Sequence, residues 1–431
     1  MTLSWSSPML VKLMNEDTQL SERVSEEDAS WIVSIGFLTS IVFCPAFFWL
    51  IDLLGRKKTM LYLSLMRITV IFVYIFATEV WMLKTIRGIT GVCEIGILSN
   101  IPAYSAEIAS KQIRGALGTI GQMSVSIGML IMLSVGPYAS YMTVNIVYVC
   151  VTALMVIPLF FIPDSPYSML RRGLTDDALK TLAYLRGSEV LAQEEVKEMT
   201  TLSGQKISRK ALFRDMIFLK TLGIVTFLNI GMQGVGYFTV TLYLQSILEA
   251  TDSSVSSDVA SVIFGVMQLL ACFFTAVLSD KAGRKPILAI TLAGLSIGMV
   301  GLGSFFHVKD SGREIEGFLN YLPLISLVIV VLCYNAGMGS LCTVLSTELH
   351  DSSTSRSIGI SVAVTVSMII GFLNLKYFPI LITMLGSAVV FWMFAVSCLV
   401  FMLFILFCVP ETKQKSFLEI QRALGRKDVV Y

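Results

Sequence analysis

The chain has 431 residues, of which 55% are hydrophobic and only 14% are charged, so a soluble fold of this length would lack the polar residues to cover its surface. The formal net charge of +2 offers no basic excess for a nucleic-acid partner, and the two histidines, His307 and His350, are too far apart in the sequence to suggest a metal site. The composition predicts an all-α membrane protein with the lipid bilayer as its main partner.

Residues 1–29 are polar and acidic, without the basic start and apolar core of a signal peptide, and we expect them to form an extracellular segment. Eleven apolar runs of spanning length follow. They cover 30–51, 59–78, 80–101, 116–136, 142–162, 217–248, 259–279, 286–306, 319–347, 357–386 and 387–409.

These runs predict a helical half with five spans at 30–162 and a second half with six spans at 217–409. The polar stretch 163–216 is expected to be a cytoplasmic linker with short amphipathic helices, such as one at 175–185. A flexible connector is the alternative for this stretch. A short tail, 410–431, ends the chain.

Basic residues gather in alternate loops and acidic residues in the loops between, which predicts the orientation because loops rich in Lys and Arg remain in the cytoplasm. The basic set is Arg56, Lys57, Lys58, Lys111, Arg114, Arg171, Arg172, Arg209, Lys210, Lys281, Arg284 and Lys285. The acidic set is Glu79, Glu249, Asp252, Asp258, Asp310, Glu314 and Glu316. The C-terminus is therefore expected in the cytoplasm, and we expect the protein in the plasma membrane.

Two copies of one charged turn suggest a duplicated half-molecule. The string D-x-x-G-R-K begins at Asp52 and again at Asp280, each time between two apolar runs. This turn resembles the signature of the major facilitator superfamily of transporters. An ordinary solvated hairpin would be the alternative for either copy alone.

Further motifs resemble those of the sugar porters within that superfamily. They are P-x-Y-x-x-E-I-A from Pro102 with R-G at Arg114, P-D-S-P from Pro163, and V-P-E-T-K-Q-K-S from Val409. Shorter strings, at Trp5 to Pro8, Ala29 to Ile32 and Pro166 to Tyr167, are similar to insect facilitated trehalose transporters. The resemblance implies a two-half helical fold, of which eleven spans are present out of an expected twelve.

The resemblance also implies a cytoplasmic gate, in which weak ion pairs between helix ends form and break in each transport cycle. Loop solvation and control of topology are the alternative roles for these charges. The proposed gate residues are Asp52, Gly55, Arg56, Glu107, Arg114, Asp280, Gly283, Arg284, Glu348 and Arg356.

A neutral sugar offers hydroxyl groups and no charge, so uncharged polar side chains near the middle of the membrane should bind it. By position in the sugar-porter motifs, these are Gln122, Gln233, Gln268 and Asn335, although each could instead make a helix-helix hydrogen bond. Two departures weaken the assignment of a sugar. Met232 and Phe238 replace a glutamine and an asparagine of the seventh-helix motif, and the tenth-helix G-P-x-P-W reads G-S-L-C-T from Gly339.

We therefore expect facilitative transport of a small neutral sugar, with trehalose preferred on resemblance, and neither enzymatic activity nor a cofactor. A proton-coupled symporter, a non-transporting sugar sensor and a defective fragment are the alternatives.

The segment before residue 30 resembles the stretch that follows the first family helix, so one span is expected to be missing upstream of Met1. Arg87 would then lack the helix that carries its acidic partner in proton-coupled relatives. Arg67 and Glu94 lie at similar depths in neighbouring runs, and an intramembrane ion pair is one hypothesis for them. The alternative is that Arg67 extends towards the cytoplasm while Glu94 is protonated.

Overall fold

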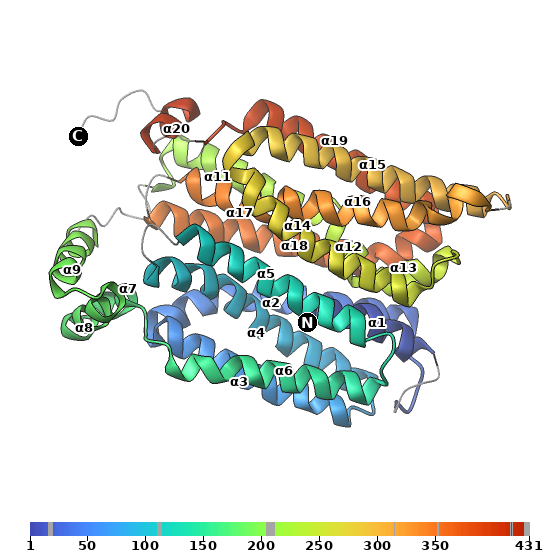
Figure 1. Ribbon diagram of the computed structural model, residues 1–431, viewed down its shortest axis with the longest axis horizontal. Coiled ribbons are helices and arrows are strands. Elements are labelled where there is room, and N and C mark those ends of the chain that lie inside the picture. Colours follow the sequence, from blue (N-terminus) through green and yellow to red (C-terminus); the bar gives the residue numbers. More distant parts are fainter. Residues whose placement is uncertain are drawn as a thin grey trace.

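The computed structural model describes residues 1–15, 20–109, 114–203, 212–313, 315–350, 353–413, 415 and 417–425. All regular structure in these ranges is helical, and the long helices run roughly side by side in one elongated bundle (Figure 1). Each of the eleven apolar runs lies on a helix or on consecutive helices.

The first half comprises α1 to α6. Its elements are α1 (Thr2–Met14), α2 (Glu26–Leu54), α3 (Arg56–Val73), η1 (Tyr74–Phe76), α4 (Val80–Ile108), α5 (Arg114–Val135) and α6 (Tyr141–Phe161). Helix α2 begins where the Ser25 side chain accepts a hydrogen bond from the Asp28 amide, and three acidic residues in its first turn complement the helix dipole.

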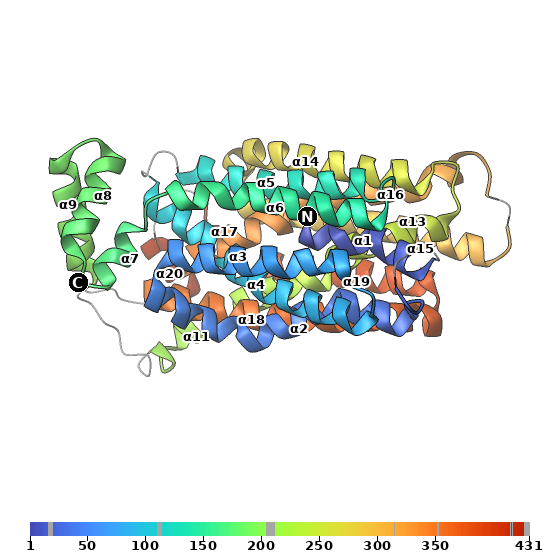
Figure 2. The ribbon, with the colours of Figure 1, turned by 90° about the horizontal axis from the view of Figure 1, so that it is seen from below.

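Short helices form the linker and the tail. They are α7 (Pro166–Arg171), α8 (Thr175–Arg186), α9 (Glu189–Ser203) and α20 (Phe417–Leu424). The helix predicted at 175–185 is confirmed as α8, which ends at Gly187 in the left-handed conformation. Helices α7, α8 and α9 stand beyond one end of the bundle (Figure 2).

The second half contains α11 to α19. Its elements are α11 (Met216–Gly234), α12 (Tyr237–Leu242), α13 (Leu244–Thr251), α14 (Ser257–Ala282), α15 (Arg284–Asp310), η2 (Gly317–Tyr321), α16 (Leu322–Ala336), α17 (Met338–Glu348), α18 (Ser353–Leu385) and α19 (Ser387–Cys408). Two of the apolar runs are therefore broken. The first is interrupted after Val235 at Gly236, where φ is 81°, and again at Tyr243, and the second is interrupted at Gly337.

By length and composition, eight helical segments among the described residues can cross a membrane, and two shorter apolar ones, Ile120–Val135 and Ser257–Phe273, accompany them. Helix α4 is also long enough, with 29 residues, but it carries several charges. Together these helices make up the multi-pass bundle that the sequence predicts.

The structure differs from expectation in the first half of segment 1–29. Thr2–Met14 form helix α1, whose 13 residues span about 20 Å, and most of its side chains are buried inside the bundle. Trp5, Met9, Leu10 and Leu13 are at most 1% exposed. The extracellular position of this segment stays a prediction.

The two halves meet along two helix pairs, α2 with α18 and α5 with α14, while α1 adds contacts to α12 and α13. The ends of the bundle differ in charge. We call the end that holds Arg56, Arg284 and α7 to α9 the basic end, and the opposite end, which holds Glu79, Glu249, Asp258 and Asp310, the acidic end.

Candidate functional site

The predicted gate residues Arg56 and Glu107 form a two-pronged ion pair at the basic end. The Arg56 Nε donates to Glu107 Oε2 at 2.6 Å, and its Nη2 lies 2.5 Å from Oε1. Asn100 of α4 makes two further hydrogen bonds to α3. Its side chain accepts from Arg56 Nη1 at 3.1 Å and donates to the Arg56 carbonyl at 2.9 Å. Paired hydrogen bonds of this kind fix direction as well as distance.

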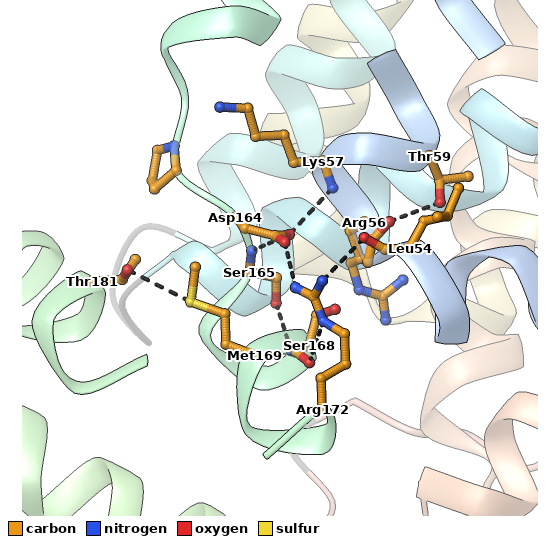
Figure 3. A network of polar contacts seen from close by, with 12 residues as sticks. Leu54, Arg56, Lys57, Thr59, Asp164, Ser165, Ser168, Met169, Arg172 and Thr181 are labelled. Atoms are coloured by element: carbon orange, nitrogen blue, oxygen red, sulfur yellow. Dashed lines mark hydrogen bonds and ion pairs between the residues drawn. The ribbon is translucent and has the colours of Figure 1, made fainter. Parts of the chain in front are cut away.

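A second carboxylate, that of Asp164, lies beside the same turn (Figure 3). It accepts from the Lys57 amide at 3.4 Å and pairs with Arg172 of the linker at 2.5 Å. Gly55 has φ of 86°, and a Cβ there would lie 2.9 Å from an Asp164 oxygen. The turn thus requires glycine both for its backbone and for the space that Asp164 and Arg172 occupy.

The second half repeats this arrangement. Gly283 has φ of 88°, and the Glu411 carboxylate accepts from the amides of Arg284 and Lys285, each at 3.1 Å. Arg284 also reaches Glu348, with Nη2 to Oε1 at 3.5 Å. Burial by itself would raise the pKa of Glu411, but the backbone amides of Lys413, Arg284, Lys285 and Thr412 outweigh it, so the pKa is lowered.

The ion pairs described at the basic end lie within one half each, Arg56 with Glu107 and Arg284 with Glu348. Arg356 lies on the first turn of α18 at the same end. The side chains of Asp52, Arg114 and Asp280 lie outside the described parts of the structure. Pairing between the halves at this end therefore stays a prediction.

Two of the predicted sugar-binding residues lie on the pair α5 and α14. Gln268 of α14 is 2% exposed, its Nε2 lies 3.0 Å from the Met129 sulfur of α5, and its Oε1 is buried with no hydrogen-bond partner. One turn further along α14, Cys272 lies 3.1 Å from the Ser126 hydroxyl of α5. Gln122 precedes Ser126 by one helical turn, so it shares the face of α5 that meets α14.

The other two predicted residues lie beside the helix breaks of the second half. Gln233, at the end of α11, is 5% exposed, and its Oε1 is likewise buried without a partner. Asn335, at the end of α16, donates to the Tyr237 hydroxyl at 3.2 Å. The ring of Tyr237 stacks on that of Tyr334 at 3.7 Å, and Tyr334 donates to the Met232 carbonyl at 3.3 Å.

We call the four predicted residues, together with Tyr237, Cys272 and Ser126, the polar path. Gln122 lies one helical turn before Ser126, Gln268 one turn before Cys272, and Gln233 four residues before Tyr237. Tyr237 accepts from Asn335, and its hydroxyl interacts electrostatically, without a hydrogen bond, with the Cys272 thiol of α14. Cys272 in turn contacts Ser126 of the other half. Amides, hydroxyls and a thiol carry no charge, so this path can exchange hydrogen bonds with a neutral, hydroxyl-rich molecule.

Sequence reasoning missed two polar residues of this region. Asn374 of α18 donates to the Gln233 carbonyl at 2.9 Å, and Ser126 contacts Cys272 across the two halves. The position of Ser126, one helical turn after Gln122, was the available signal for the second residue. For Asn374, a lone amide within a long apolar run was the signal.

Helix α1 changes the surroundings of Arg87. This arginine is 6% exposed and donates to the Ile32 carbonyl at 3.1 Å, the Thr2 carbonyl at 3.1 Å and the Ser6 hydroxyl at 2.9 Å. The indole of Trp5 lies 5.6 Å from its guanidinium carbon. Its guanidinium is thus held by neutral groups, and no carboxylate lies within 4.0 Å of it among the described residues.

Arg67 and Glu94 interact electrostatically across α3 and α4. No ion pair within 4.0 Å joins them in the described ranges, and the Arg67 Nε is buried without a hydrogen-bond partner. The Tyr148 ring centre lies 5.9 Å from the Arg67 guanidinium carbon. The ion pair hypothesised from the sequence is therefore not a direct contact here, and Glu94 attracts Arg67 from beyond 4.0 Å.

Comparison with known proteins gives consistent matches. The family described as "Sugar (and other) transporter" matches residues 5–424. The facilitated trehalose transporter Tret1 of Polypedilum vanderplanki is 31% identical over 427 residues, which cover 98% of this chain and 84% of that protein. Tret1 of Drosophila grimshawi is 30% identical, and there the aligned part covers 98% of this chain but only 46% of the relative.

Solved structures agree on the fold. The xylose transporter XylE of E. coli, in a partially occluded inward-open conformation, superposes with a TM-score of 0.79 at 20% identity and covers 96% of this chain and 95% of XylE. The proton:xylose symporter XylE bound to 6-bromo-6-deoxy-D-glucose gives a TM-score of 0.77, with 98% of this chain and 96% of XylE covered.

Proposed function

The chain belongs to the sugar transporter family of the major facilitator superfamily, and from this premise we propose that it carries a small neutral sugar across a membrane by facilitated diffusion. Transport requires no covalent chemistry, and the two halves would expose the polar path to each side in turn. Trehalose is the proposed substrate because the two insect relatives above are named as trehalose transporters.

One observation carries the proposal. Gln233 and Gln268 each bury an amide oxygen without a hydrogen-bond partner in the described structure, and a buried acceptor left unpaired costs about 1–3 kcal/mol. A sugar hydroxyl that donates to either oxygen would recover this free energy. Because the path is uncharged, a neutral polyol suits it better than an ionised solute.

The surroundings of Arg87 favour facilitated diffusion over proton symport. Coupling to protons needs a group that gains and loses a proton near neutral pH, and Arg87 is held by carbonyl and hydroxyl oxygens and by an indole ring. Uptake of radiolabelled trehalose into vesicles should therefore be unaffected by a protonophore. Uptake that collapses with the protonophore would support the symporter instead.

The predicted binding residues can be tested by substitution. We expect Gln233→Ala and Gln268→Ala each to lower kcat/KM for uptake by about 5- to 150-fold, which corresponds to about 1–3 kcal/mol. Thermal stability should change only modestly, because neither amide oxygen has a partner to lose and Gln268 gives up only its weak contact with the Met129 sulfur.

Gln245 provides the matched control. Its side chain donates to Ser257 and Asp258 and accepts from Ser261, so Gln245→Ala should lower the melting temperature while the KM stays unchanged. If the two path variants lose stability and keep their KM, they are helix contacts and the substrate assignment fails.

We also propose that the basic end faces the cytoplasm, with the C-terminus, in the plasma membrane. The distribution of Lys and Arg among the loops supports this orientation. An epitope tag at the C-terminus should bind antibody only after the cells are permeabilised, and binding to intact cells would reverse the orientation.

A further inference from the structure

One lysine crosses the boundary between the halves near the acidic end. Lys376 of α18 belongs to the second half, and its Nζ donates to the Ser30 hydroxyl of α2, in the first half, at 2.8 Å. The same ammonium lies 4.2 Å from the centre of the Trp31 ring. Lys376 is only 8% exposed, which is unusual for a lysine.

The groups in direct contact with this lysine are neutral, while Glu27 and Asp28 attract its charge from farther away. Asp28, the neighbouring acid on α2, is paired with Lys84 of the same half at 2.5 Å. Glu26 and Glu27 line a pocket of about 560 Å³ that Lys376 also borders, and both are exposed. No carboxylate lies within 4.0 Å of the Lys376 ammonium in the described ranges.

We propose that Lys376 is a positioning residue for the transport cycle, a latch that holds the acidic end closed by binding Ser30 and Trp31 across the boundary between the halves. This inference rests on the proposed alternating access. Opening of the acidic end would part α2 from α18 and break both contacts at once.

The chemistry of the contact suits a reversible latch. A buried ion pair would leave a charge without its partner in the open state, which is strongly unfavourable. Lys376 instead gives up its hydration in the closed state for a ring face and one hydroxyl, and it regains water when the end opens. The two states can therefore lie close in free energy, as a transporter that cycles requires.

A cysteine reporter tests the latch without any sugar. Phe372 lies one helical turn before Lys376, and its ring centre is 6.1 Å from that of Trp31. In vesicles of the full-length chain carrying Phe372→Cys, a membrane-impermeant maleimide is added on the acidic side, and labelling of the unsubstituted chain is subtracted. We expect Lys376→Met to raise the labelling rate at least severalfold.

Four companion variants make the result decisive. Lys376→Arg should restore slow labelling, because a guanidinium can also donate to Ser30 and stack on Trp31. Trp31→Leu should raise labelling with the lysine still present, and the double variant with Lys376→Met should add little to either single change. Lys309→Met removes a lysine at the same end that bonds the Ala250 carbonyl within one half, and it should leave labelling unchanged.

Equal labelling of the Phe372→Cys chain with and without Lys376→Met would overturn the latch, as would an equal rise in Lys309→Met. The latch would also be overturned if every variant, Lys376→Arg included, were labelled faster and melted at a lower temperature. A general loosening of the fold would then explain the labelling. Sugar uptake does not enter this readout, so a wrong substrate would leave the latch result intact.

Discussion

Glu411 and Asp164 have the same task at matching places in the two halves. Each carboxylate follows the last helix of its half and accepts hydrogen bonds from backbone amides in a turn between two earlier helices. For Asp164 this is the turn after Gly55, and for Glu411 it is the turn after Gly283. A single charge thereby satisfies amides at the start of a helix, which a neutral side chain would do less well. Asp164 and Glu411, which belong to the motifs that begin at Pro163 and Val409, thus act as clasps at the basic end.

The clasp made by Glu411 predicts a pH dependence. The pKa of Glu411 is lowered in the folded protein, so its contribution to stability is present above the ordinary value of 4.5 and is lost as the pH falls through the folded-state pKa. Glu411→Gln should lower the melting temperature by the same amount at every pH from about 6 to 8. The difference from the unsubstituted protein should shrink only in acid, and a difference that shrinks between pH 6 and 8 would contradict the assigned cause.

Helices α2 and α4 approach each other unusually closely, and glycines make this possible. A Cβ on Gly91 would lie 2.4 Å from the Gly36 Cα and 2.5 Å from the Gly36 carbonyl oxygen. Both neighbouring atoms belong to the backbone, so neither can move without moving its helix. Two hydroxyl groups of α2 also form hydrogen bonds with α4 at this crossing. Thr39 donates to the Gly88 carbonyl at 2.8 Å and Ser40 to the Gly91 carbonyl at 3.1 Å.

Gly91→Ala should therefore force α2 and α4 apart and lower both the melting temperature and the amount of protein in the membrane. Overpacking of this kind costs typically about 1–3 kcal/mol. Gly223 on α11 is the control, because a Cβ there would meet no atom within 4 Å. Gly223→Ala should be neutral or slightly stabilising, by up to about 1 kcal/mol, since alanine favours the helix. Equal effects of the two changes, measured by thermal unfolding in detergent, would refute the close crossing.

The long helices were predictable from sequence, but α1 and the helix breaks within two of the apolar runs were not. Runs such as 286–306 and 387–409 are apolar on all sides and of bilayer length, which is a strong signal. Helix α1 is short and carries four polar side chains among its first six residues, so it gives no such signal, although Trp5, Met9 and Leu13 recur every four residues. The breaks at Gly236 and Gly337 depend on packing between helices, which a hydropathy pattern does not record.

In the candidate site, residue types were easier to predict than their partners. The four polar residues on separate helices could be named from motif positions, because an amide within an apolar run is unusual. Their hydrogen bonds depend on how α5, α12, α14 and α16 are rotated towards one another. The acceptors of Arg87 on α1 could not be predicted for the same reason.

Across the described parts of the molecule, hydrogen bonds between the halves lie near the acidic end and in the middle of the bundle. Near the acidic end the halves are joined by Lys376 with Ser30 and by the Ser7 hydroxyl, which accepts from the Gln245 amide at 3.0 Å. At the basic end the described ion pairs stay within each half. The halves are thus joined at the acidic end, and under the alternating access proposed above each half would keep its own clasp and ion pair as the halves rock.

A cross-link between the halves can test this arrangement. The hydroxyl of Ser126, in the first half, lies 3.1 Å from the sulfur of Cys272, a free cysteine in the second half. Ser126→Cys should therefore place two sulfur atoms within easy reach of disulfide geometry. After oxidation and cleavage at a protease site inserted in the linker, the two halves should stay together on a non-reducing gel and separate when a reductant is added.

The cross-link should also stop transport, because rocking requires α5 and α14 to move past each other at this point. We expect uptake to be lost on oxidation and recovered with reductant. In the control that combines Ser126→Cys with Cys272→Ser, oxidation should change neither the uptake nor the separation of the halves on the gel. Halves that separate without reductant would show that α5 and α14 do not meet at Ser126. Cross-linked halves that still transport would place the movement elsewhere, within the broken helices α11 to α13 and α16 to α17, and would refute rocking of rigid halves.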